Sequence, residues 1–370
     1  MLLVKNTLLI GSEIYRCAAF GSNHPLSIPR VSTVIDLVRA LGLCDTKDYK
    51  SAPKAKPELL TQFHTEPYIA ALQRAEASQV VSKTDRKDYN FGSLSNPLFP
   101  LMFERPATSV GSSLLAAEFV AKGGRAYSLG GGLHHGMAGR ANGFCFLNDL
   151  VFAINRLRSL GVLRIAYVDL DAHHCDGVEA AFPKDSNLLM ISIHEAHRWP
   201  FTGQVKDNVP GRILDIPLPS ACNDAEFNYA FEYLVPPILD RFAPDALIVQ
   251  GGGDALHVDP MSRLSLSNDA LWRALRLILE HSSRVILPGG GGYNPWSVAR
   301  LWSGFWAILS GQSVPNELTP MAADILKTLK WNRRRTVPSY FTKTLLDPPT
   351  KGNIRIEVKD LVEYLRKRHF

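Results

Sequence analysis

The sequence lacks any apolar run long enough to cross a membrane, since a transmembrane helix needs roughly 20 consecutive apolar residues. Its beginning, MLLVKNTLLIGSEIYRC, does not follow the charged, apolar and small-residue order of a secretory signal peptide. Internal repeats, low-complexity stretches and long linkers are also missing. These absences argue against a membrane protein and a repeat protein, and we expect a cytoplasmic protein with no membrane partner.

Cysteine and excess charge are both scarce. The five cysteines form no Cys-x-x-Cys pair, which argues against a disulfide framework and favours free thiols in a reducing compartment. The net charge is only +6, and part of it lies in the basic segments 330–335 and 364–370. Such segments could contact nucleic acid or an acidic partner, but solvated surface is their more common role. We therefore do not expect nucleic acid as a partner.

Apolar runs and helical segments alternate along the chain. Runs that are apolar throughout, as in strands buried on both faces of a parallel sheet, occupy residues 163–170, 187–194, 245–250 and 284–289. Segments with helical spacing occupy residues 109–123, 147–161, 225–242 and 267–282. This alternation predicts an α/β fold, in which one domain over residues 1–370 holds a doubly wound, mainly parallel sheet. We expect segments 46–58 and 310–353 to be surface excursions.

Glycine-rich and polar stretches follow five of the expected strands. They occupy residues 130–136, 169–177, 195–203, 251–259 and 289–294. Ligands of open α/β sheets bind beyond the carboxyl ends of the strands, so the five stretches predict one cleft at that edge.

The stretch DLDAH combines carboxylates and an imidazole with alternating spacing. Asp169, Asp171 and His173 project to one side while the chain stays extended. A lone Asp or His at a strand end is often a helix cap or a satisfied polar residue. Joined by Asp254 from another strand end, however, a carboxylate and the imidazole form a mixed nitrogen and oxygen site. This set suits catalytic Zn²⁺, with Fe²⁺ or Co²⁺ as competitors.

Two adjacent histidines and one tyrosine follow glycine runs at the same edge. His134 and His135 can act as a general base and an electrostatic or proton-donating partner if carboxylates tune them unequally. Asp169 and Asp176 are the spare carboxylates nearby. Tyr293 ends the run GGGGY, where its hydroxyl could stabilise an oxyanion beside a metal.

Several motifs in order resemble the zinc-dependent histone deacetylase superfamily, which includes acetoin-utilisation and acetylpolyamine amidohydrolase-like proteins. They are FHTEPYI (63–69), GGLHHGMAGRANGFCFLND (131–149), YVDLDAHHCDGVEAAF (167–182), FAPDALIVQGGGDALHVDPM (242–261) and GGGGYN (289–294). The resemblance extends from about residue 24 to 309, and we include the basic tail 310–370 in the same domain. It implies the arginase/deacetylase fold.

The resemblance also implies roles for individual residues. The metal ligands would be Asp171, His173 and Asp254, and the catalytic residues would be His134, His135, Asp169, Asp176 and Tyr293. A K⁺ or Na⁺ ion near the zinc would be bound by Asp169, Asp171, His173, Ser192 and Ile193. The substrate would contact Gly143, Phe144, Trp199, Met261 and Ser95, with Phe144 and Trp199 as the walls of a lysine tunnel. Arg30 would lie in an internal acetate channel.

Three positions depart from the family pattern. Ser95 stands where many members have an aspartate that clamps the substrate backbone, which puts a tight peptide clamp in question. Cys175 stands where glycine is usual, and its thiol is either inert or redox-sensitive. Met261 offers no charge at the tunnel mouth, which favours acyl-lysine over a substrate with a second ammonium group.

The function that we expect is metal-dependent hydrolysis of acyl-lysine-type amides, with an acylated peptide, protein or small acylated amine as partner. A deacylase of acetylpolyamines or other small amides is the main alternative. A binuclear manganese ureohydrolase of the same fold and a non-catalytic acyl-lysine-binding scaffold are further alternatives, and oligomerisation is left open.

Overall fold

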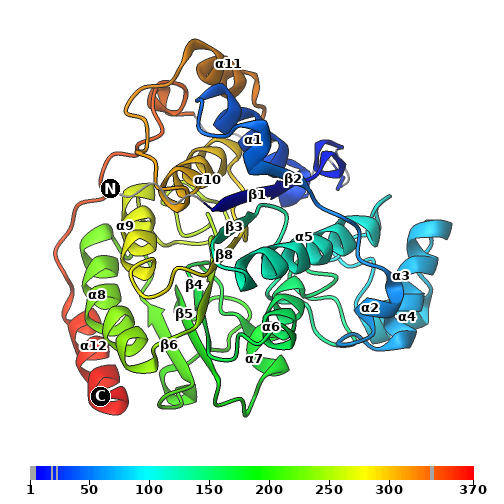
Figure 1. The fold of residues 1–370 in the computed structure, drawn as a ribbon, viewed down its shortest axis with the longest axis horizontal. Coiled ribbons are helices and arrows are strands. Elements are labelled where there is room, and N and C mark those ends of the chain that lie inside the picture. Colours follow the sequence, from blue (N-terminus) through cyan, green and yellow to red (C-terminus); the bar gives the residue numbers. More distant parts are fainter. Residues whose placement is uncertain (1–5, 18–19, 22–23, 334–336) are drawn as a thin grey trace.

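Eight parallel strands form one sheet in the computed structural model, which describes residues 6–17, 20–21, 24–333 and 337–370 (Figure 1). Their order in the sheet is β2-β1-β3-β8-β7-β4-β5-β6. The strands are β1 (Thr7–Gly11), β2 (Tyr49–Ser51), β3 (Arg125–Ser128), β4 (Ile165–Asp169), β5 (Leu188–Glu195), β6 (Ile213–Leu218), β7 (Ala246–Gln250) and β8 (Val285–Pro288). The predicted parallel α/β sheet is confirmed.

Helices cover both faces of this sheet (Figure 1). One face packs against α1 (Arg30–Ala40), α8 (Asp224–Phe242), α9 (Asn268–Ile278) and α10 (Pro295–Leu309). In the same apolar cluster, α11 (Pro320–Thr328) packs against α1, and α12 (Ile356–His369) packs against α8. The other face packs against α5 (Glu104–Ala121), α6 (Asp149–Ser159) and α7 (Asp176–Ala181). A third apolar cluster lies under α2 (Pro57–Leu60), α3 (Glu66–Ser78) and α4 (Lys83–Tyr89). Short 3₁₀ helices occupy Glu13–Arg16, Pro25–Ser27, Thr46–Asp48, Val205–Asp207 and Ser339–Thr342.

Burial on both faces explains why the central strands are apolar throughout. On β4, Ala166 and Val168 join the core beneath α8 and α10, while Ile165 and Tyr167 join the core beneath α5 and α6. The parallel register also places Asp169, the last residue of β4, opposite Ser192 on β5 and Gln250 on β7. The polar stretches after these strands therefore emerge together at one edge.

The expectation of a surface excursion over residues 310–353 is only partly confirmed, because most of the described residues there are exposed or half-buried but a few join the core. Helix α10 is buried along its whole length, so the chain that follows must cover its outer side. The tail does so with α11 and with Phe341 and Leu345, which are buried. Arg300 of α10 also forms a buried ion pair with Asp347 at 2.7 Å. Segment 46–58 likewise contains the edge strand β2.

The second basic segment, 364–370, belongs to α12, which packs against α8. Arg366 lies over the ring of Tyr233 at 5.6 Å, and His369 Nε2 lies 3.0 Å from Asn208 Oδ1. Of the first basic segment, residues 334 and 335 lie outside the described residues. Part of the positive charge at the C-terminal end is thus used for packing within the chain.

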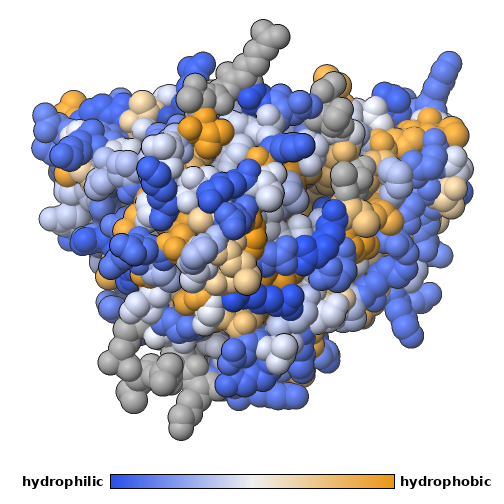
Figure 2. Space-filling view, turned by 90° about the horizontal axis from the view of Figure 1, so that it is seen from above, coloured by the Kyte–Doolittle hydropathy of each residue, from blue (hydrophilic) through white to orange (hydrophobic). Residues whose placement is uncertain are grey.

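The surface shows no sign of a membrane helix. Across the described ranges, no helix combines the length and apolar character needed to span a bilayer. On the face in Figure 2, hydrophobic residues lie in small groups among hydrophilic ones.

All five cysteines are free thiols, as the sequence predicts.

Candidate active site

The three predicted metal ligands meet beyond the ends of β4 and β7. His173 Nδ1 lies 3.2 Å from Asp171 Oδ1 and 3.0 Å from Asp254 Oδ2. One donor atom from each residue lies within 4.8 Å of the others, and all three side chains are buried. The structure thus brings together the set that the sequence predicts.

The surroundings of this triad fit a divalent cation. Asp171 Oδ2 accepts a hydrogen bond from the Gly291 amide at 2.7 Å, and Asp254 Oδ1 accepts one from the Ala172 amide at 2.9 Å. These bonds fix both carboxylates with their other oxygens toward His173. A Cβ at position 291 would lie 2.1 Å from Asp254 Oδ2, so glycine keeps this space open. Two buried carboxylates facing one imidazole leave an uncompensated negative charge, which a divalent ion would balance.

Each histidine of the tandem pair is bonded to its own carboxylate. His134 Nδ1 lies 2.8 Å from Asp169 Oδ2, and His135 Nδ1 lies 2.7 Å from Asp176 Oδ1. The two ring centroids are 3.9 Å apart. Asn142, whose role the sequence did not reveal, donates its amide to Asp176 Oδ2 at 2.9 Å. Both imidazoles therefore have a fixed orientation, with Nε2 left for chemistry.

The two histidines differ in protonation. Burial lowers the pKa of each imidazole, but the carboxylates of Asp169 and Asp171 outweigh it at His134 and raise that pKa to about 9. At His135, burial and the charge of His134 together lower the pKa to about 4, although Asp176 opposes them. At neutral pH the pair thus consists of one charged and one neutral imidazole.

A buried aspartate holds the glycine turn that carries the two histidines. Asp149, the first residue of α6, accepts hydrogen bonds from the amides of Gly132 at 3.0 Å and Leu133 at 2.7 Å, and from the Ser113 hydroxyl at 2.6 Å. This role of Asp149 was not predicted from the sequence. Its only signal is its place at the start of an apolar helix, where a helix-terminal acid is common.

Tyr293 lies at the same edge and is positioned through Asp259. The Tyr293 amide donates to Asp259 Oδ2 at 2.6 Å, and the Met261 amide donates to Asp259 Oδ1 at 2.9 Å. Burial and then the carboxylates of Asp254 and Asp171 raise the pKa of Tyr293 well above its ordinary value, so the phenol stays a donor. Asp259 itself was missed by the sequence analysis.

Aromatic side chains line the approach to the triad. The Phe144 ring lies 5.7 Å from Tyr293, and the Trp199 ring lies 4.6 Å from His135 and 6.2 Å from His173. Gly143 packs so closely that a Cβ there would lie 2.3 Å from the indole of Trp199.

Phe144 adopts a left-handed backbone conformation with φ 68°. Its amide donates to the buried Asn96 Oδ1 at 3.1 Å, a contact that the sequence did not reveal. The neighbouring Ser95 lines a surface cavity together with Phe144 and His24.

Arg30 is partly buried and lies close to the glycine run after β8. Its guanidinium donates to the Gly290 carbonyl at 2.6 Å and lies 6.0 Å from the centroid of the Tyr293 ring. Arg30, Tyr15 and Leu133 line a small cavity of about 80 Å³. A channel role for Arg30 stays a prediction.

The remaining predicted residues lie near the loop after β4. Ser192 and Ile193 are on β5, and the Ser192 hydroxyl lies 2.9 Å from His194 Nδ1. Binding of a monovalent cation at these positions stays a prediction. Burial raises the pKa of the Cys175 thiol well above its ordinary value, which favours the inert alternative over a redox-sensitive thiol.

The chain is similar in sequence and in fold to known proteins. Residues 24–309 match the histone deacetylase domain. The chain is 34% identical over 331 residues to the acetoin utilization protein AcuC of Bacillus subtilis, covering 86% of this chain and 85% of that protein. It superposes on the crystal structure of a histone deacetylase homologue from Aquifex aeolicus with a TM-score of 0.93, 38% identity and coverage of 98% and 100%. A crystal structure of such a homologue complexed with SAHA matches with the same values. The chain belongs to the histone deacetylase family.

Proposed function

We propose that this protein hydrolyses the amide bond of an acylated lysine or a related acylated amine. The observation that carries the proposal is the pairing of a carboxylate and imidazole triad with two histidines of unequal pKa. A scaffold that only binds acyl-lysine would need the triad but would not need one charged and one neutral imidazole. Membership of the histone deacetylase family supports the same reaction.

Asp171, His173 and Asp254 would hold the metal. Three nitrogen and oxygen ligands suit Zn²⁺, with Fe²⁺ as the alternative. A bound divalent ion supplies Lewis acidity toward the acyl oxygen and lowers the pKa of water.

The two histidines divide the proton transfers between them. The Nδ1–H group of neutral His135 donates a hydrogen bond to Asp176, which leaves a lone pair on Nε2. This lone pair accepts a proton from the attacking water. As the C–N bond breaks, the leaving nitrogen takes a proton from His134, whose cationic form is stabilised by Asp169. The products are a carboxylic acid and an amine.

The other polar residues act on the acyl group and its product. The Tyr293 hydroxyl donates a hydrogen bond to the oxyanion that forms on the acyl oxygen. Arg30 would attract the released acid toward the small cavity that it lines. A K⁺ or Na⁺ ion at Asp169 and Ser192 would fix the loop that carries the ligands.

The tunnel walls favour an unbranched apolar stem. Phe144 and Trp199 would enclose the methylene groups of a lysine side chain, and Met261 adds no charge at the mouth. Ser95 is shorter than an aspartate and carries no charge, so it would bind a peptide backbone only weakly through hydrogen bonds. Acyl-lysine peptides are therefore the first substrate class, and acetylpolyamines are the second.

The test is amine release by Zn²⁺-loaded protein from acetyl-lysine peptides, longer acyl-lysines and acetylpolyamines. Each reaction is repeated with a chelator and with SAHA, the compound bound to the similar homologue. Turnover that is lost with chelator and inhibited by SAHA supports the proposal. A protein that holds metal but turns over no substrate would favour the binding-scaffold alternative.

A further inference from the structure

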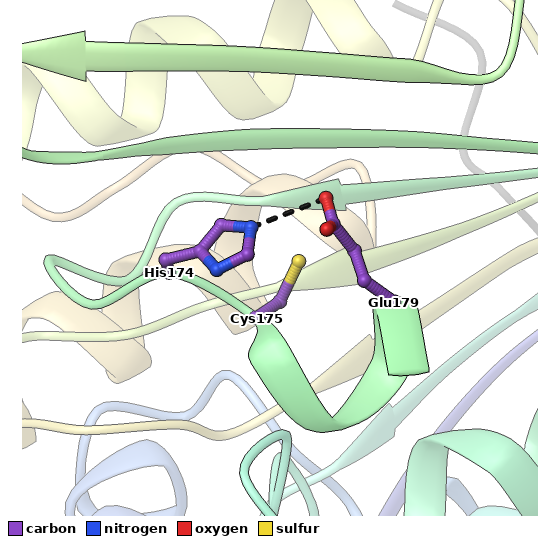
Figure 3. A group of neighbouring side chains, drawn as sticks. All are labelled: His174, Cys175 and Glu179. Carbon is purple, nitrogen blue, oxygen red and sulfur yellow. Dashed lines mark ion pairs between the residues drawn. The ribbon is translucent and has the colours of Figure 1, made fainter. Parts of the chain in front are cut away.

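A second group of metal-binding side chains lies beside the catalytic loop. His174 and Cys175 precede α7, and Glu179 lies in its first turn. One donor atom from each lies within 4.8 Å of the others, and Figure 3 shows the imidazole, the sulfur and the carboxylate pointing toward one another. Asp215 of β6 lies beside this group, with its Oδ1 3.2 Å from His174 Nε2.

Four polar atoms of this group are buried and have no hydrogen-bond partner: His174 Nε2, Glu179 Oε1 and both carboxylate oxygens of Asp215. His174 Nε2 lies 3.1 Å from Glu179 Oε1 and 3.2 Å from Asp215 Oδ1, yet it forms a hydrogen bond with neither. Both carboxylate oxygens of Asp215, which is 0% exposed, are also without hydrogen bonds. Buried polar atoms without partners are rare and need an explanation. The imidazole and the carboxylates lie close together, but their angles do not suit hydrogen bonds. Such an arrangement fits a cation bound between them better than an ion pair.

The charges point the same way. Within the described residues, the ion pairs of Glu179 and Asp215 involve the single imidazole of His174, so one buried and one partly buried carboxylate share one potential cation. The other ring nitrogen of His174 lies 2.8 Å from Thr202 Oγ1. Metal-binding histidines commonly donate their second N–H to such an oxygen.

We propose that His174, Cys175, Glu179 and Asp215 bind a second Zn²⁺ ion, separate from the one at the candidate active site. Nitrogen, sulfur and two carboxylate oxygens make a closed four-ligand set of the structural kind, in contrast to the three-ligand triad. His174 follows His173 directly, but its side chain contacts Thr202 and Asp215 rather than the triad.

The second ion would join three parts of the fold: the loop after β4, helix α7 and strand β6. Asp176, which orients His135, immediately follows Cys175, so the ion would also stabilise the carboxylate that orients this histidine. This inference goes beyond the proposed function, because it adds a site that the hydrolysis itself does not use.

Cobalt substitution separates the two sites, because only the second contains sulfur. The metal content of the purified protein is measured first, and the chelator-treated protein is then titrated with Co²⁺. We expect a second equivalent of metal per chain and a thiolate-to-cobalt charge-transfer band in the near ultraviolet. Asp254→Asn should lose the first equivalent and keep the band. If the protein hydrolyses none of the substrates, the band should still appear, because the second site does not depend on the hydrolase activity.

Three further variants test the ligand set. Cys175→Ser should abolish the band, and Asp215→Asn should weaken binding of the second equivalent by at least tenfold. Cys222→Ser, which removes another buried thiol, should change neither. The proposal is overturned if the wild-type protein and Asp254→Asn both lack the band and the second equivalent of metal. The cluster would then be an ion pair of His174 with its carboxylates. This comparison does not depend on whether Cys175→Ser folds.

Discussion

Replacing Tyr293 by phenylalanine removes one hydroxyl and leaves its surroundings intact. The ring keeps its contacts with Phe144 at 5.7 Å and with the Arg30 guanidinium at 6.0 Å. The backbone amide still donates to Asp259, so the position of the residue should not change. Deleting one donor to an oxyanion lowers kcat by about 10²–10³-fold, or about 2.7–4 kcal/mol. We expect a loss of that size in kcat with little change in KM, because the bond strengthens only in the transition state.

The assay combines initial rates on an acetyl-lysine peptide with metal content and thermal unfolding. Tyr127→Phe is the matched control, because it removes another buried hydroxyl, one that has no hydrogen-bond partner. The control should keep its kcat, and both variants should keep their metal and a Tm close to the wild-type value. A Tyr293→Phe enzyme with wild-type kcat would refute the oxyanion role.

Three other results should follow. Because His135 must be neutral and His134 protonated, kcat/KM should fall as the pH drops through about 4 and as it rises through about 9; a profile with one limb would contradict this division of roles. Asn96→Ala leaves the Phe144 amide without its acceptor, a cost of about 1–3 kcal/mol, and should raise KM on peptides more than it lowers kcat. Chelation should lower Tm, and Zn²⁺ at 100 times its Kd should restore about 2.7 kcal/mol of stability; an unchanged Tm would speak against metal bound to the folded state.

The sequence predicted the centre of the fold well, because burial on both faces leaves a continuous apolar signal. Strands β4 and β5 are such cases, and the polar residues at their ends mark the site because charge there is costly. Edge strand β2 carries no such signal, since two of its three residues are exposed. The tail around α11 was partly misread because its few buried residues are spaced among polar ones.

Three of the residues that the sequence missed form hydrogen bonds with backbone atoms elsewhere in the chain. Asp259 bonds the amide of Tyr293, Asn96 bonds the amide of Phe144, and Asp149 bonds the turn before His134. A backbone amide has no residue-type signature, so neither spacing nor composition could identify these pairs. The metal triad was easier to find because all its members are side chains with ligand chemistry at strand ends.

Sheet order and chemistry are linked in this site. His134 follows β3, Asp171 follows β4, Asp254 follows β7 and Tyr293 follows β8, while the spatial order of these strands is β3-β8-β7-β4. The chain therefore inserts its two later strands between two earlier ones. Their loops must enter a space already bounded by the histidine turn, where a Cβ at position 132 would lie 2.6 Å from the Gly290 amide nitrogen. The glycine runs after β3 and β8 are thus a requirement of this topology. They let the backbones approach closely enough for the carboxylates that follow β4 and β7 to face His173, with the histidine pair beside them.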